Sequence, residues 1–273
     1  MPGESNAVAG VLHERQRPVL LRFVTSSLVV AEMEARKIKH ASSELWIRAI
    51  QPALWLLVFG SALAGVRDIA PSQFSYMAFI TPGILSQSVL FIAIFYGVTL
   101  VWERDLGLLN KLLATPAPRP SIVVGKALAA SIRGVFQGLL VLALSIAIGT
   151  GISVNLLYIL GVFGVVILLA MCFSSLSMVI ASLARTRDRM MGLSQVIIFP
   201  LFFASNAIYP TQIMPEWLQL VAKANPLSYG VQAVRSLLLT QNFTMLPTDL
   251  AVLAGYTLGL LSLASLVLRR IAS

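Results

Sequence analysis

The sequence predicts an all-α polytopic membrane protein, and three observations lead to this fold class. Hydrophobic residues make up 58% of the 273 positions, charged residues make up only 11%, and the apolar residues fall in long runs without charge. An ordinary globular domain carries about 25% charged residues. A chain with so few charges could not cover a soluble core with polar surface, so a lipid bilayer is the expected solvent.

The charge-free runs predict six transmembrane helices. A helix needs about 20 apolar residues to span the hydrocarbon core. The longest run, 134–184, holds two helices, because the turn-forming residues Gly149, Thr150 and Gly151 interrupt it. The expected spans are 47–66, 74–101, 125–148, 155–183, 190–208 and 249–268.

The placement of basic residues predicts the orientation. With six spans both termini lie on one side, and 17 of the 20 Lys and Arg residues fall on that side. The other side holds Arg67, Lys223 and Arg235. By the positive-inside rule, both termini are expected to be cytoplasmic. Topology and contact with membrane lipid then explain the net charge of +9, and nucleic acid is not an expected partner.

The N-terminal part is expected to contain a helix that lies on the membrane surface. Residues 1–19 are expected to be a flexible cytoplasmic N-terminus. Residues 20–43 lack Pro and Gly, and their apolar positions recur at helical spacing among charged residues, which favours an interfacial amphipathic helix. The alternative is a charged leader that only sets the topology.

The sequence offers no catalytic or metal site. Both histidines precede the first span, and the acidic pairs Glu32 with Glu34 and Glu103 with Asp105 lie among basic residues and are interpreted as solvated. A membrane enzyme or an ion-coupled carrier would need ionisable groups at the membrane face or inside the spans, and the spans carry essentially none. We therefore expect neither catalysis nor ion coupling from this chain.

A nucleotide site is not expected either. The dipeptide Gly125-Lys126 could end a phosphate-binding loop, but Pro120 stands where that loop needs Gly, and Ala127 stands where it needs Ser or Thr. No cofactor is therefore expected in this chain. If ATP and Mg²⁺ supply the energy, a partner subunit binds them.

The loop between the second and third spans, 102–123, is expected to carry a short cytoplasmic helix. A helix over 106–114 would place Leu108 or Leu109 with Leu112 on one face, and the prolines that follow would end it. Such an apolar ridge could fit a groove on a soluble partner. A merely solvated loop is the alternative.

The segment 209–247, before the last span, is too apolar for free exposure outside the membrane. It is expected to dip into the outer leaflet or to cap the spans. Asn225 and Pro226 mark a turn between two short helices, 215–224 and 227–240. Arg235 is expected to be paired with Glu216 or hydrated at the membrane surface.

Several motifs in these two loops resemble those of one transporter family. They are Glu103-Arg104-x-x-Gly107, Leu112-Leu113-x-Thr115-Pro116, Gly125-Lys126, Tyr209-Pro210, Pro215-x-Trp217-Leu218 and Asn225-Pro226-Leu227-x-Tyr229-x5-Arg235. Together they are similar to the permease subunit of type-2 ATP-binding-cassette exporters, and among those to the drug-resistance and Nod-factor export permeases. The resemblance covers nearly the whole chain after residue 20.

The resemblance implies an inner-membrane half-transporter with a single permease domain over 20–273, a coupling helix in the first cytoplasmic loop and short re-entrant helices before the last span. A second permease copy, identical or related, would pair with it, and two cytosolic ATP-binding-cassette ATPase subunits would bind the ATP and Mg²⁺. The residues implied in coupling to the ATPase are Glu103, Arg104, Gly107, Leu112, Thr115 and Pro116. Those of the external re-entrant motif are Trp217, Pro226, Tyr229 and Arg235.

In that family the second and fifth spans line the translocation path. The matching side chains here combine apolar rings with uncharged polar groups: Gln87, Phe91, Gln195, Phe199, Phe203 and Asn206. For each of them, helix packing is the alternative role.

The expected function is therefore the transmembrane subunit of an ATP-driven exporter that moves a drug, a lipid or a lipid-linked glycan out across the cytoplasmic membrane. Two alternatives belong to other classes. A polytopic enzyme acting on lipid would need a cluster of carboxylates or histidines. A non-transporting membrane anchor for a cytoplasmic ATPase would form a complex without moving any solute.

Overall fold

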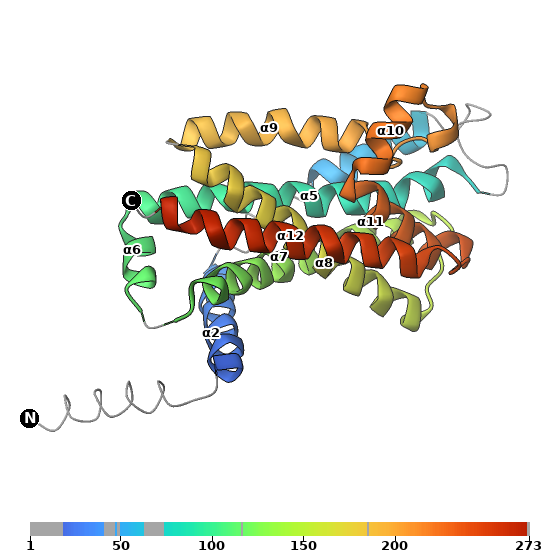
Figure 1. The fold of residues 1–273 in the computed structure, drawn as a ribbon. Helices are drawn as coiled ribbons and strands as arrows, with labels where there is room; N and C mark the ends of the chain where they lie inside the picture. Colours follow the sequence, from blue (N-terminus) through green and yellow to red (C-terminus); the bar gives the residue numbers. More distant parts are fainter. Residues whose placement is uncertain are drawn as a thin grey trace, which may run out of the picture.

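The computed structural model describes residues 19–40, 47, 50–62, 74–115, 117–184 and 186–271. Within these residues the chain is helical, with no β-strand, which confirms the all-α class. Figure 1 shows the long helices side by side in one bundle. The elements are α2 (Val19–His40), η1 (Trp55–Phe59), α4 (Gly60–Ala62), α5 (Tyr76–Asp105), α6 (Leu108–Leu113), α7 (Arg119–Ile148), α8 (Leu156–Leu183), α9 (Arg187–Phe203), η2 (Thr211–Ile213), α10 (Glu216–Ala224), α11 (Pro226–Arg235), η3 (Ser236–Thr240) and α12 (Leu246–Ile271).

Four helices in the described part of the chain are long and apolar enough to cross a membrane. They are Tyr76–Asp105, Arg119–Ile148, Leu156–Leu183 and Leu246–Leu268, and they match the expected second, third, fourth and sixth spans. The chain is therefore a multi-pass membrane protein.

The expected first and fifth spans are represented by shorter helices. The first corresponds to an apolar helix over Ile50–Ala62, and positions 48–49 and 63–66 of that expected span lie outside the described residues. The fifth corresponds to α9, whose 17 residues end at Phe203 rather than at position 208. At about 1.5 Å per residue, the 17 residues of α9 extend about 25 Å, which is at the lower limit for a membrane span.

Local sequence signals set several helix ends. The Ser75 side chain accepts a hydrogen bond from the Ala78 amide at 3.1 Å and caps the start of α5. Asn155 caps α8 in the same way. Gly149 ends α7 with φ of +74°, a left-handed conformation that glycine adopts at little cost, so the expected turn between the third and fourth spans is confirmed.

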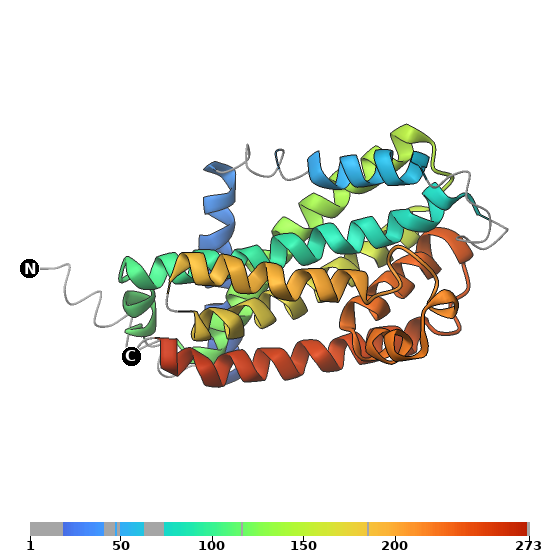
Figure 2. The same cartoon turned by 90° about the horizontal axis from the view of Figure 1, so that it is seen from above.

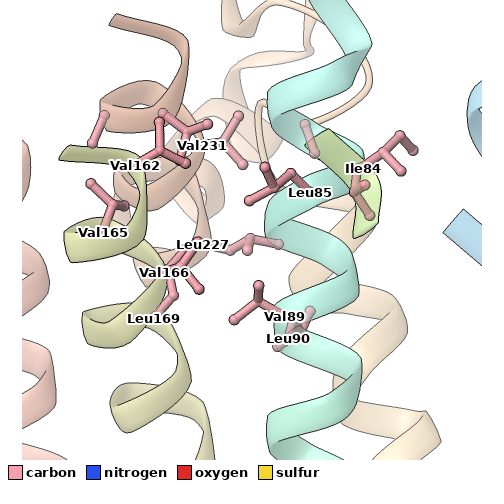
Figure 3. Close-up of a cluster of buried hydrophobic side chains, with 14 of the residues drawn as sticks. Ile84, Leu85, Val89, Leu90, Val162, Val165, Val166, Leu169, Leu227 and Val231 are labelled. Atoms are coloured by element: carbon pink, nitrogen blue, oxygen red, sulfur yellow. The ribbon is translucent and has the colours of Figure 1, made fainter. Parts of the chain in front are cut away.

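Helix α5 lies at the centre of the bundle and is buried on nearly all faces. Figure 3 shows Leu85 and Val89 of α5 facing Val166 of α8, with Leu227 of α11 between them. A helix that is apolar all round and buried all round is a core element rather than a surface one. The elements that surround α5 therefore share one hydrophobic core with it.

Helix α2 runs across the long axis of the bundle, near the end that carries α6 (Figure 1, Figure 2). It packs on α7 through Gly125, where an added Cβ would lie 2.7 Å from the Ser27 carbonyl oxygen. On its outer side Leu21, Val24 and Leu28 are exposed. The expected amphipathic helix is therefore present, with one face on the bundle and an apolar face left uncovered.

Candidate functional site

A fully buried ammonium group joins three helices at the α6 end of the bundle. Lys126 of α7 is 1% exposed. Its Nζ lies 3.1 Å from Glu34 Oε1 of α2 and 2.5 Å from Glu103 Oε2 of α5. Burying charges is costly unless they are paired and hydrogen-bonded, so this geometry holds the three helices in one arrangement.

This cluster corrects the interpretation of Glu34 and Glu103 as solvated acids. Glu34 is 2% exposed, and the Glu103 side chain is mostly buried. Further along α7, the Arg133 guanidinium lies 4.6 Å from the centre of the Tyr96 ring. The expectation of essentially no ionisable groups inside the spans is therefore wrong at this end. A lysine at the start of an apolar helix was the available signal.

The two residues after Glu103 bond two other elements. Arg104 donates from Nη1 to the Ala184 carbonyl oxygen at 3.1 Å, just after α8. Asp105 Oδ2 lies 3.6 Å from Arg187 Nε at the start of α9, and the Arg187 guanidinium stacks on the Trp102 ring at 4.1 Å. The last turn of α5 is thus bonded to α7, α9 and the end of α8, and Lys126 of α7 links it in turn to α2.

Helix α6 follows this turn and is shorter than the expected 106–114. Gly107 has φ of +69°, which lets the chain reverse between α5 and α6. Thr115 donates from Oγ1 to the Leu112 carbonyl oxygen at 2.6 Å, where the helix has ended. Pro116, also expected in the coupling region, lies outside the described residues.

The apolar ridge expected on this loop faces the protein itself. Leu109 is fully buried, and Leu112 packs against the core cluster at this end. The exposed apolar side chains here are instead Leu106 and Leu108. The burial arises because Gly107 folds α6 back against the bundle, a geometry that residue spacing alone does not specify.

Four of the six expected path residues line one cavity of about 280 Å³. They are Gln87 and Phe91 of α5 and Gln195 and Phe199 of α9. Sequence reasoning missed Gln137 of α7, which lines the same cavity and is 1% exposed. Neither amide atom of Gln137 has a hydrogen-bond partner among the described residues.

The rest of this lining consists of uncharged side chains: Gln51, Pro52, Ser88, Ile92, Phe95 and Ile198. Such a cavity combines aromatic surface with amide donors and acceptors. It therefore suits a molecule with an apolar body and neutral polar groups.

The other two expected path residues lie elsewhere. Phe203 stacks on Phe199, with ring centres 6.2 Å apart, but is not part of the lining. Asn206 lies beyond the end of α9, and its carbonyl oxygen accepts from Arg235 Nη2 at 2.9 Å. The early end of α9 separates Asn206 from the cavity.

The segment before the last span forms the opposite end of the bundle from α6 (Figure 1). It contains the two expected short helices, α10 and α11, with Pro226 as the first residue of α11. Asn225 caps α11 and also donates from Nδ2 to the Leu201 and Ala204 carbonyl oxygens at 2.6 and 3.1 Å. These bonds tie the segment to the end of α9.

The remaining residues of the external motif have different environments. Trp217 is exposed, and Tyr229 donates from its hydroxyl to the Lys223 carbonyl oxygen at 2.6 Å. Arg235 neither pairs with Glu216 nor lies free in water. It is packed against the start of α5, with its guanidinium 4.1 Å from the centre of the Phe79 ring.

The long apolar helices, the uncharged cavity between α5, α7 and α9, and the bonded last turn of α5 define a polytopic membrane protein. Within the described part of the chain, no group of His, Cys, Asp and Glu could hold a metal ion. Comparison with known proteins gives the family. The ABC-2 type transporter family matches residues 25–239, so the chain belongs to this family, and the resemblance seen in the sequence is confirmed.

Three relatives show how far the similarity extends. Daunorubicin resistance ABC transporter permease protein DrrB1 of Streptomyces coeruleorubidus is 27% identical over 244 residues, 86% of this chain and 82% of that protein. Nodulation protein J of Rhizobium leguminosarum bv. trifolii is 26% identical over 234 residues, 85% and 88% of the two chains. Inner membrane transport permease YadH of Escherichia coli strain K12 is 26% identical over 233 residues, 80% and 86% of the two chains.

Proposed function

We propose that this chain is the transmembrane subunit of an ATP-driven exporter, which moves a drug, a lipid or a lipid-linked glycan out across the cytoplasmic membrane. A separate cytosolic ATPase subunit supplies the energy. The observation that carries the proposal is the last turn of α5, where three consecutive residues, Glu103, Arg104 and Asp105, bond different neighbouring elements.

This last turn of α5, called the corner below, can transmit a force from the cytoplasmic side to the rest of the bundle. A force on α6 reaches α5 across the short turn at Gly107, and the bonds of the α5 end pass it to α7, to α9 and to the end of α8. Packed helices linked in this way move as units rather than bending freely. Closure of the ATPase would therefore tilt α5 and α9 and change the width of the cavity between them.

This chain offers the ATPase a concave surface beside α6. A cavity of about 290 Å³ lies between α2 and the α6 segment, lined among others by Arg22, Thr25, Leu112 and Thr115. Leu106 and Leu108 are exposed at the same end of the bundle. Together they supply the apolar and polar surface that a soluble partner needs.

The path for the substrate runs along α5 and α9. Aromatic and amide side chains alternate on the cavity wall, which favours an amphiphile over a small ion. The outer face of α9 exposes Val196, Phe199 and Phe203, and we assign this face to a second permease copy. The path would then lie between two equivalent α9 helices.

The proposal includes six membrane crossings with both termini in the cytoplasm. The helix over Ile50–Ala62 and α9 supply the first and fifth crossings, each extended by neighbouring residues. The exposed apolar face of α2 lies on the inner leaflet, and α10 and α11 re-enter the outer leaflet. The positive-inside distribution of Lys and Arg supports this orientation.

The proposal is tested by reversing the charge at the corner. Glu103→Lys places a second cation beside the buried Lys126, so it should leave membrane insertion intact while uncoupling ATP hydrolysis from export. The measurement is substrate-stimulated ATP hydrolysis and export in inverted vesicles that contain the permease and its ATPase. Unchanged stimulated hydrolysis together with unchanged export in Glu103→Lys would rule out the coupling role.

Two further variants make this test specific. Glu216→Lys makes the same charge change at the exposed start of α10, far from the corner, and should leave coupling intact. The exchange Glu103→Lys with Lys126→Glu restores one ion pair of the cluster and should recover part of the coupling that the single change loses.

A further inference from the structure

A second cavity lies at the end of the bundle opposite α6, between the start of α5, the turns after α9 and the α11–η3 segment. Its volume is about 300 Å³. The lining includes Phe79, Asn206, Gln232, Arg235, Thr240 and Asn242, and it contains no carboxylate. It is separate from the proposed translocation cavity, with which it shares no lining residue.

The Arg235 guanidinium forms one wall of this cavity, and no carboxylate of the described residues pairs with it. It makes one hydrogen bond, from Nη2 to the Asn206 carbonyl oxygen, and stacks on the Phe79 ring. Its Nε is buried and has no acceptor among the described residues. A guanidinium carries five N–H donors, so these contacts satisfy only part of it.

The environment of Arg235 makes this incomplete pairing costly. Burial lowers the pKa of the guanidinium to about 10, which still leaves it charged at pH 7. An arginine in an ordinary structural ion pair lies against a carboxylate. No carboxylate of the described residues contacts Arg235. A buried cation of this kind favours an anionic partner.

A second unpaired group narrows the chemistry of that partner. The Asn206 Oδ1 atom is buried without a donor at the wall of the same cavity. Because Asn206 Oδ1 is an acceptor, a partner that satisfies it must carry an O–H or N–H group beside the anion. Hydroxyl and amide groups of Ser236, Thr240, Gln232 and Asn242 supply further hydrogen-bonding capacity around the space.

We infer that this cavity binds an oxyanion that also carries an O–H donor, with Arg235 paired to the charge and Asn206 accepting from the hydroxyl. A phosphoglycerol lipid headgroup and free monohydrogen phosphate both have this chemistry. The inferred binding does not rest on the proposed export function, because this cavity shares no lining residue with the other one.

Binding is measured on the whole purified chain in phosphatidylcholine nanodiscs by titration calorimetry, with empty nanodiscs as the blank. One arm adds dihexanoyl phosphatidylglycerol, with dihexanoyl phosphatidylcholine as the neutral comparison. The other arm adds inorganic phosphate at constant ionic strength. The chain should bind the anionic lipid saturably and more tightly than the neutral one.

Variants then assign the binding to Arg235. Arg235→Met should weaken it by about tenfold or more, because a charge-assisted hydrogen bond is lost. Lys223→Gln removes one positive charge from the exposed surface of α10 and should leave binding unchanged. Gln232→Glu places a carboxylate one helical turn from Arg235, where it would pair with the cation and exclude the anion.

The outcomes are distinct. Saturable phosphate binding as well as lipid binding supports a site for the free anion, and lipid binding alone supports a headgroup site. Equal affinity in the unsubstituted chain, Arg235→Met and Gln232→Glu overturns the inference, as does the absence of saturable binding of either anion. If Arg235→Met fails to fold, Gln232→Glu decides. None of these results bears on export, because no ATPase is present.

Discussion

The Lys126 ammonium group is buried between the carboxylates of Glu34 and Glu103. Replacing Lys126 with Met removes the ammonium group that lies between the two buried carboxylates. Removing one partner of a buried ion pair typically costs about 3–5 kcal/mol. Lys126→Met should therefore lower the thermal midpoint of the purified protein sharply.

The control for this prediction removes the charges together. Lys126→Met combined with Glu34→Gln and Glu103→Gln removes all three charges of the cluster, so much of the lost stability should return. If Lys126→Met alone is as stable as the unsubstituted chain, the cluster does not hold the helices together.

Gly107 offers a test of the turn between α5 and α6. Its φ of +69° is unfavourable for a residue with a Cβ by about 1–2 kcal/mol, and an added Cβ would meet nothing within 4 Å. Gly107→Ala should therefore cost backbone strain without a clash, and Gly107→Asn should cost less. Thermal unfolding in detergent measures both, and an equal loss for Ala and Asn would contradict the assigned conformation.

Residue types in the sequence were enough to predict part of the site. Gln87, Phe91, Gln195 and Phe199 stood out as polar or aromatic residues on two expected spans, and they share one cavity. Gln137 could not be assigned to it, because nothing in the sequence specifies which face of α7 lies against α5. The pairing of Glu34 with Lys126 depends in the same way on how α2 packs across the bundle.

At the scale of elements, hydropathy located the helices better than their ends. Helix α5 continues to Asp105 and α7 begins at Arg119, although the apolar windows suggested 101 and 125. Charged residues end an apolar run but do not end a helix. Helix α5 ends just before Gly107, and α7 begins just after Pro118. The bonded residues Glu103, Arg104 and Asp105 all lie in the extension of α5 beyond the expected span.

The contact between α5 and the turn after α9 depends on Gly83. A Cβ at this position would lie 2.1 Å from the Ala207 carbonyl oxygen, which belongs to the backbone and cannot rotate away. Gly83→Ala should destabilise the protein by about 1–3 kcal/mol through overpacking. Gly255→Ala is the matched control, because nothing lies within 4 Å of a Cβ there.

Thermal midpoints of the two alanine variants test this packing. Gly255→Ala should be neutral or slightly stabilising, since alanine favours helix over glycine. If Gly83→Ala matches Gly255→Ala in midpoint, the close approach of α5 to Ala207 does not exist in the folded protein.

At the scale of the whole molecule, the sparse charges had the most predictive power. They indicated a membrane protein and the number of apolar segments, and the motifs between those segments indicated the family that the comparisons confirm. They could not fix the number of crossings, because α9 is at the lower limit of length for a span and the residues on both sides of the helix over Ile50–Ala62 lie outside the described part of the chain.

The orientation is tested by thiol labelling with a membrane-impermeant maleimide. The native Cys172 is buried in α8, so the unsubstituted chain should react little. Lys111→Cys in α6 and Glu216→Cys in α10 replace exposed side chains at opposite ends of the bundle. Because the positive-inside rule places α6 in the cytoplasm, Glu216→Cys should label in intact cells and Lys111→Cys only after the cells are opened. The proposed topology would be overturned if both variants label in intact cells, or if only Lys111→Cys does. Either result would also overturn the proposed binding of the ATPase beside α6.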